Sequence, residues 1–285
     1  MASRPRNISL HLIRTSDQEL MLYNFTECLE TFQLEINHTS LYGLNADMIW
    51  PRVTTLRIHA SESFQISHLA RAFPNVQHFK CSHPLPMLPD LHPHWSYLDE
   101  VDTSSPIELY SRVRRIRFRY DRGTEPEENN RVALAMLQRA SPVILKCEVH
   151  PEVVERIPEV APDLKHLTIF LRDGRGELID LVVSAQSLTT SRALRKLPLV
   201  ALSVGLCTQS PLYDVPRLRD TAQRIVVALP TLEYISFDTL DSLGFPRTCC
   251  WFRVTTRGVC LPQLNVLSQA EIGVVESELL SLDRG

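Results

Sequence analysis

Glycine is scarce in this chain, with 9 residues among 285. The phosphate-binding loops Gly-x-x-x-x-Gly-Lys-Ser/Thr and Gly-x-Gly-x-x-Gly are absent, as are the Gly-x-Ser-x-Gly nucleophile turn and the zinc motif His-Glu-x-x-His. The sequence therefore offers no residue to which catalysis can be assigned, and we expect a protein that is not an enzyme. A hydrolase whose site is recognised only by its geometry is the alternative from another functional class.

Long apolar runs and an excess of charge of one sign are also missing. The formal net charge is −3, and the longest uncharged apolar stretch, residues 197–207, is too short to span a bilayer. No apolar segment typical of a secretory signal follows the start of the chain. The 7 cysteines show no disulfide spacing, which favours reduced thiols. We therefore expect a cytoplasmic or nuclear protein that has no cofactor and does not contact a membrane.

The sequence does contain a short apolar pattern that recurs along the chain. Its unit is an apolar residue, two variable residues, an apolar residue, one variable residue and a third apolar residue. Copies begin at positions 29, 53, 76, 98, 113, 164, 199 and 232, and shorter copies occupy residues 10–12 and 145–147. The second apolar position falls at 32, 56, 79 and 101, in steps of 24, 23 and 22 residues. These steps lie within the leucine-rich-repeat period of roughly 20–29 residues.

After position 101 the repeat becomes irregular, with steps of 15, 29, 22, 35 and 33 residues. The last two apolar positions of each unit are two residues apart, so they share one face of a strand. Segments with helical spacing separate many of the units, at 66–73, 131–137, 153–160, 178–188 and 218–229. We therefore predict an α/β fold over residues 6–265: an irregular leucine-rich-repeat solenoid, or horseshoe, with an inner parallel sheet and outer helices.

Residues 266–285 are predicted to form a C-terminal capping helix and tail. Segment 268–282 has the pattern of an amphipathic helix, and a terminal repeat needs a cap because it otherwise exposes its core and a strand edge. We expect Trp251 and Phe252 to form an aromatic plug beneath this helix. The alternative is that both rings form an exposed contact for a partner.

The joints between helices and strands carry a family resemblance. The phrases Phe-Pro-Asn-Val at 73–76 and Leu-Pro-Thr-Leu-Glu at 229–233, the irregular repeats and the aromatic-rich segment 249–254 resemble the repeat region of fungal F-box-like leucine-rich-repeat proteins. The resemblance covers roughly residues 29–254 and implies repeats that hold a substrate protein while an F-box binds the adaptor of an SCF-type ubiquitin ligase. Nothing before Phe32 matches the Leu-Pro-x-Glu-like helical segment of an F-box. We therefore expect a diverged relative or a partial gene product that keeps only the repeats; the alternative is a stand-alone leucine-rich-repeat scaffold with no ubiquitin link.

The variable positions beside the inward-pointing residues are predicted to line the concave face of the sheet. In the middle of the array they form a basic strip that Glu100 and Asp102 interrupt. The predicted partner-binding residues are Arg57, His59, His78, Lys80, Arg115, Arg117, Arg119 and Lys146. We hypothesise an acidic or phosphorylated protein segment as the ligand, because guanidinium groups bind carboxylates and phosphates through paired hydrogen bonds. The alternative is a solvated strand face whose charges prevent aggregation.

Some other patterns have simpler explanations than a binding site. Cys81 and the histidines at 83, 92 and 94 carry zinc-binding groups, but their spacing matches no zinc finger, so we expect no metal and interpret the histidines as solvated. The adjacent Cys249 and Cys250 are interpreted as ordinary thiols beside buried aromatic residues rather than as a redox switch. Basic and apolar residues alternate at 112–120 as in some RNA-binding segments, but the apolar members should be buried, so we do not expect a nucleic-acid partner.

Overall fold

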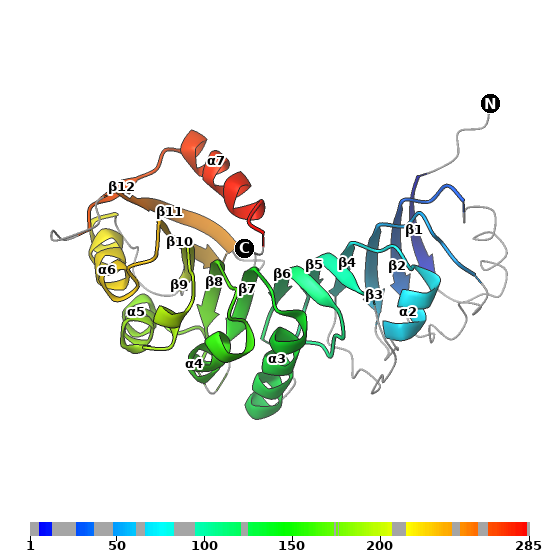
Figure 1. Ribbon diagram of the computed structural model, residues 1–285, viewed down its shortest axis with the longest axis horizontal. Coiled ribbons are helices and arrows are strands. Elements are labelled where there is room, and N and C mark those ends of the chain that lie inside the picture. The colour runs from blue at the N-terminus through cyan, green and yellow to red at the C-terminus, as the bar shows by residue number, and fades with distance from the viewer. Residues whose placement is uncertain are drawn as a thin grey trace. The chain divides into compact units, whose positions relative to one another are not determined.

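The computed structural model divides the chain into two compact units, unit 1 (residues 1–121) and unit 2 (residues 122–285). The structure describes residues 6–12, 27–36, 48–60, 66–82, 95–120, 125–173, 175, 177–206, 215–240, 246–255 and 262–283. Both units are built on mostly parallel strands with helices between them (Figure 1), so the predicted α/β class is confirmed. The division of the chain into residues 6–265 and 266–285 stays a prediction.

The described part of unit 1 is a parallel sheet whose strands follow chain order. The strands are β1 (Asn7–Leu12), β2 (Thr31–Ile36), β3 (Thr55–Ala60), β4 (His78–Ser82), β5 (Tyr97–Thr103) and β6 (Arg112–Phe118). The register joins successive copies of the apolar pattern: Phe32 lies opposite Leu56, and Leu56 lies opposite Phe79. These three side chains are buried, which confirms that the second apolar position of the pattern points into the core.

An aromatic cluster fills the core beside helix α2 (Ile66–Ala72). The ring of Phe73 lies 5.0 Å from that of Trp50 and 5.3 Å from that of Phe32. The joint that follows the helix is tied to the neighbouring repeats by hydrogen bonds. The Asn75 amide donates to the carbonyl of Pro51 (2.7 Å), and the Trp95 indole donates to the carbonyl of Phe73 (2.7 Å). The Phe-Pro-Asn-Val phrase therefore forms a structural joint that ties the end of α2 to the repeats on either side of it.

The short step of 15 residues between positions 101 and 116 corresponds to a repeat without a helix. Strands β5 and β6 pair directly, with Val101 opposite Ile116. Residues 104–111 connect the two strands through a loop that contains no helix. The repeat becomes irregular here because the outer helix is missing, while the strand pairing continues unchanged.

The described sheet of unit 2 begins as a parallel sheet and ends with two antiparallel strands. Strands β7 (Ile144–Val149), β8 (His166–Leu171), β9 (Ala201–Leu206) and β10 (Tyr234–Leu240) are parallel. They are followed by β11 (Pro246–Val254) and β12 (Leu264–Val266), which pair antiparallel. These last two strands were not predicted, because their segments carry no copy of the apolar pattern.

The helices of unit 2 lie on both sides of its sheet (Figure 1). Helices α3 (Pro126–Ala140), α4 (Pro151–Val160), α5 (Leu181–Thr190) and α6 (Val215–Ala228), with the short 3₁₀ helix η2 (Leu194–Lys196), alternate with the strands and cover one side. The four segments predicted to be helical in this part of the chain, 131–137, 153–160, 178–188 and 218–229, all overlap these α-helices. Helix α7 (Gln269–Leu280) lies on the opposite side of the sheet.

Helix α7 begins with a capping box in which Ser268 and Glu271 each bind the backbone N–H of the other. Its buried residues Val275 and Leu279 pack against Trp251, as predicted. The prediction for Phe252 was wrong: neighbouring residues of a strand point to opposite faces, and the Phe252 ring lies 6.2 Å from Phe237, a buried core residue of β10.

None of the helices in the described part of the chain has the length and apolar content needed to cross a lipid bilayer.

Candidate partner-binding surface

The register of unit 1 gathers most of the predicted binding residues into two rows across the strands. The first row contains Gln33, Arg57, Lys80, Asp102 and Arg117, and the second contains Thr31, Thr55, His78, Glu100 and Arg115. These residues alternate with the buried residues of the same strands, so they share the other face of the sheet. Together with His59 and Ser82, the two rows form what we call the open face of unit 1.

Carboxylates of β5 neutralise part of this face. The Asp99 carboxylate accepts hydrogen bonds from Arg114 (3.0 Å) and from Arg115. Burial alone would raise the pKa of Asp99, but the two guanidinium groups outweigh it and hold the pKa below its ordinary value of 3.8. Arg115 also lies 3.5 Å from Glu100. The predicted cation Arg115 is therefore bound within the molecule.

Asp102 has the same role in the neighbouring row. One of its oxygens lies 3.1 Å from the Lys80 ammonium, and the other lies 3.8 Å from the Arg117 guanidinium. The imidazole of His78 lies 3.6 Å from the Glu100 carboxylate. Partly exposed ion pairs of this kind stabilise a protein by at most about 1 kcal/mol. A ligand of higher charge density can therefore compete with Asp102 for Lys80, and Asp102 would keep Arg117 as its partner.

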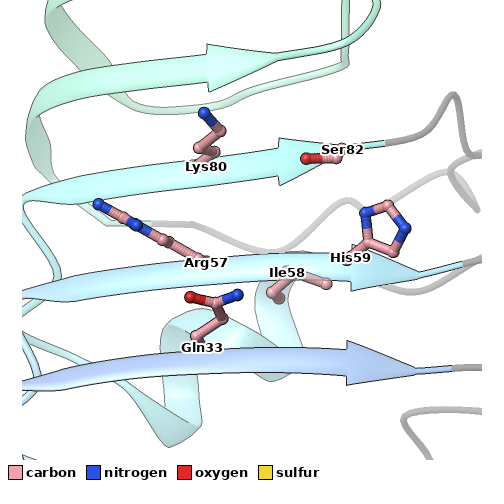
Figure 2. A pocket seen from close by; sticks show the side chains of 6 residues that line it. All are labelled: Gln33, Arg57, Ile58, His59, Lys80 and Ser82. Carbon is pink, nitrogen blue, oxygen red and sulfur yellow. The ribbon is translucent and has the colours of Figure 1, made fainter. Parts of the chain in front are cut away.

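A hollow of about 270 Å³ lies beside Arg57 and Lys80 (Figure 2). Its lining residues are Gln33, Arg57, Ile58, His59, Lys80 and Ser82, and none of them is acidic. Arg57 and Lys80 lie at one end of the hollow, and His59 and Ser82 lie at the other. Arg57 is exposed, and no carboxylate of the described residues forms an ion pair with it. The hollow thus offers guanidinium, ammonium, amide and hydroxyl donors to an anionic group.

Two of the predicted binding residues lie elsewhere. Arg119 follows the end of β6 and is half-buried. Lys146 belongs to β7 of unit 2, where its ammonium lies 3.8 Å from the Asp238 carboxylate. The sequence pattern placed Lys146 in the same strip as Arg57, whereas the structure gives it a partner within its own unit.

The corresponding rows of unit 2 are largely buried. We call them the covered face of unit 2. Its residues are Ile144, His166, Ala201 and Tyr234 in one row; Lys146, Thr168, Ser203, Ser236 and Trp251 in the next; and Glu148, Phe170, Gly205 and Asp238 in the third. Ser203 and Ser236 are 3% and 0% exposed, and the Ser236 hydroxyl donates to that of Ser203 at 2.6 Å. Helix α7 covers the Ala201 and Trp251 end of this face.

A buried ion pair closes one edge of the covered face. Both Nε and Nη2 of Arg172 donate to one oxygen of Glu148, at 2.9 and 2.6 Å. Sequence reasoning singled out neither this pair nor the Asp99 and Arg114 pair in unit 1. The strand register could have indicated a related ion pair, Glu100 with Arg115, because it places these two residues opposite each other on neighbouring strands.

Histidine and cysteine chemistry gives no further site in the described residues. No group of three or more His, Cys, Asp and Glu side chains there is placed to hold a metal ion, and the histidines at 83, 92 and 94 lie outside this part of the chain. Cys81 and Cys147 are free thiols. Burial raises the pKa of Cys81 to about 12, which makes this thiol a poor nucleophile.

No protein-family model matches the chain, and no curated protein matches it.

Proposed function

We propose that the chain is a non-catalytic leucine-rich-repeat module that binds an acidic segment of a partner protein on the open face of unit 1. The observation that carries the proposal is the hollow beside Arg57 and Lys80, whose lining contains no carboxylate among the side chains that the structure describes. On the same face, β5 carboxylates bind Arg115 and Arg117, and Asp102 also binds Lys80 of the hollow, whereas no described carboxylate forms an ion pair with Arg57. Among these cations, Arg57 is therefore the one for which an external anion meets the least competition. The irregular strand repeat supports the leucine-rich-repeat assignment.

The resemblance to F-box-like proteins extends the proposal to a ubiquitin-ligase context, in which the repeats select the substrate. The free thiols of Cys81 and Cys147 are compatible with a reducing compartment, the cytoplasm or the nucleus. A stand-alone scaffold would use the same face and differ only in the absence of ligase subunits among its partners.

Affinity purification of the tagged chain from its native cells, followed by mass spectrometry, tests both parts. The wild-type chain is compared with the double variant Arg57→Ala, Lys80→Ala and with the matched control Arg156→Ala, which removes an exposed arginine from α4. We expect one or more proteins to be recovered with the wild type and the control, and to be lost from the double variant. An unchanged set of proteins in all three samples contradicts binding at the hollow.

The same purification tests the ligase context. Recovery of an SCF adaptor and a cullin supports substrate recognition for ubiquitination, and the proteins lost from the double variant are then candidate substrates. Recovery of a specific partner without any ligase subunit contradicts the ubiquitin link and leaves the stand-alone scaffold.

A further inference from the structure

Helix α7 packs on the sheet of unit 2 along one apolar stripe. Its buried residues Val275 and Leu279 pack with Ala201, Trp251 and Leu267, and the partly buried Ile272 and Leu282 add to this packing. Val274 and Leu280 on the same helix are 58% and 48% exposed. Gly273 lies inside the helix, and a Cβ added there would meet no atom within 4 Å. Packing therefore does not require glycine at this position, although glycine destabilises a helix. The capping box, in contrast, is local and needs no contact with the sheet.

The charges of α7 and of the surface below it are complementary. The segment from 269 to 283 carries acidic residues at 271, 276, 278 and 283 and no lysine or arginine. On the sheet side, the Lys165 ammonium donates to the backbone carbonyl of Asp283. The Arg253 guanidinium lies 5.6 Å from the centre of the Tyr234 ring and contributes to the lowered pKa of Glu271, after the larger effect of the Ser268 hydrogen bonds. Cations of the sheet therefore face an acidic helix.

The surface beneath α7 also contains an unsatisfied donor. Trp251 is 3% exposed, and its indole N–H has no hydrogen-bond partner among the described residues. A buried donor without an acceptor costs free energy, so α7 does not use everything that this surface offers. A ligand that places a carbonyl or carboxylate near the indole would bind with one more hydrogen bond than α7 makes.

We propose that the surface formed by Ala201, Tyr234 and Trp251, with Lys165 and Arg253 at its rim, binds an acidic amphipathic helix of a partner protein in place of α7. The helix that fits carries two aliphatic residues four positions apart, as Val275 and Leu279 are in α7. Helix α7 is the occupant of this surface when the partner is absent. This second surface is separate from the hollow in unit 1 and does not depend on the function proposed for it.

A peptide of residues 266–283 with a fluorescent label serves as the probe, because it has the chemistry that we assign to the partner helix. Its binding is measured by fluorescence anisotropy to the full wild-type chain and to the full chain with Val275→Ser and Leu279→Ser. The tethered helix competes with the peptide in the wild type at a high effective concentration. We therefore expect binding to the double variant to be at least about tenfold tighter than to the wild type. A peptide with serine at both aliphatic positions is the control and should bind neither chain.

Further variants separate the surface from general effects on folding. Adding Trp251→Ala to the double variant should abolish the gain in peptide binding. Gly273→Ala in the otherwise wild-type chain should stabilise helix α7 and so weaken the binding of the peptide further. If circular dichroism shows that the serine variants are unfolded, the charge reversals Glu271→Lys and Glu278→Lys, at exposed positions of α7, take their place, and the same gain is expected. Peptide binding that stays at the wild-type level in the folded variant, or that survives Trp251→Ala, overturns the proposal.

Discussion

The open face of unit 1 and the covered face of unit 2 occupy the same positions of the strand pattern but have opposite environments. In unit 1, Arg57 and Lys80 are exposed and line a hollow. In unit 2, Ser203 and Ser236 occupy the equivalent row and are buried. The pattern of apolar residues determines which way a side chain points, because alternate residues of a strand face opposite sides. Whether that side is solvated depends on segments outside the pattern, such as α7.

The ion pairs of the two faces also differ in how far their side chains are exposed to solvent. Glu148 and Arg172 in unit 2 have side chains that are 9% and 7% exposed, whereas Asp102 and Arg117 in unit 1 are 21% and 31% exposed. Water screens the partly exposed pair, so losing one member costs little. A buried pair that loses one member leaves a charge without compensation.

Removal of Arg172 should therefore have the largest effect on stability. We expect Arg172→Met to lower the free energy of unfolding by about 3–5 kcal/mol, because Glu148 would remain buried and unpaired. The matched change in unit 1, Arg117→Met, should cost at most about 1 kcal/mol. Urea unfolding, combined with hydrogen exchange to locate the destabilised unit, measures both. Equal losses would show that the two faces do not differ in their electrostatic environment.

Much of this comparison could be predicted from the sequence, and part of it could not. The strands, the inward position of Leu56 and Phe79 and the helices between strands follow from spacing, because local periodicity selects the buried face. The contact of Trp251 with the C-terminal helix was also predicted correctly. These features depend on residues that are close in the chain or that repeat with a constant period.

The remaining features depend on contacts between distant segments. Lys146 pairs with Asp238, and Lys165 binds the carbonyl of Asp283, although the members of each pair are far apart in the sequence. No period relates such residues, so the burial of the covered face could not be predicted. The neutralisation of Arg115 by Asp99 and Glu100 needed the register between β5 and β6, which the short step in the repeat made difficult to assign.

The pH dependence of stability should differ between the faces. Burial of the imidazole and the nearby Lys146 ammonium lower the pKa of His166 in unit 2 from 6.5 to about 4. Below pH 6.5 His166 binds a proton in the unfolded chain, whereas in the folded chain it binds one only as the pH approaches about 4. Stability should therefore fall between these values, by up to about 1.4 kcal/mol per pH unit. His166→Gln should remove this slope in unfolding experiments at stepped pH.

Asp99, whose carboxylate binds Arg115 of the open face, provides the contrasting pH window. Because its folded pKa lies below 3.8, its contribution is present above pH 3.8 and is lost as the pH falls further. Asp99→Asn should change the profile below pH 3.8 and leave the slope between pH 6.5 and 4 intact. A loss of that slope in Asp99→Asn, or its persistence in His166→Gln, would contradict the assignment of the two windows.

Close packing on the covered face should be visible at Gly205. A Cβ added to Gly205 would lie 2.0 Å from Cδ1 of Phe170, whose ring is buried, so Gly205→Ala should cost about 1–3 kcal/mol. Gly273→Ala in α7 is the matched control, because its Cβ meets nothing within 4 Å, and should stabilise by about 0.5–1 kcal/mol. Adding Phe170→Leu to Gly205→Ala should recover part of the loss in a double-mutant cycle. Equal small effects at both glycines would mean that the covered face has free space.

The smallest effect on stability is expected at Arg57. Its side chain is exposed and forms no ion pair with a described carboxylate, so Arg57→Ala should change the free energy of unfolding by no more than about 0.5 kcal/mol. The same urea unfolding experiment measures it, with Arg172→Met as the reference for a structural arginine. A loss above about 1 kcal/mol would assign Arg57 a structural role. A negligible loss, together with the loss of a partner in the affinity purification, would mean that this cation contributes to binding without contributing to the fold. That combination separates a surface kept for a ligand from a strand face kept soluble by its charges.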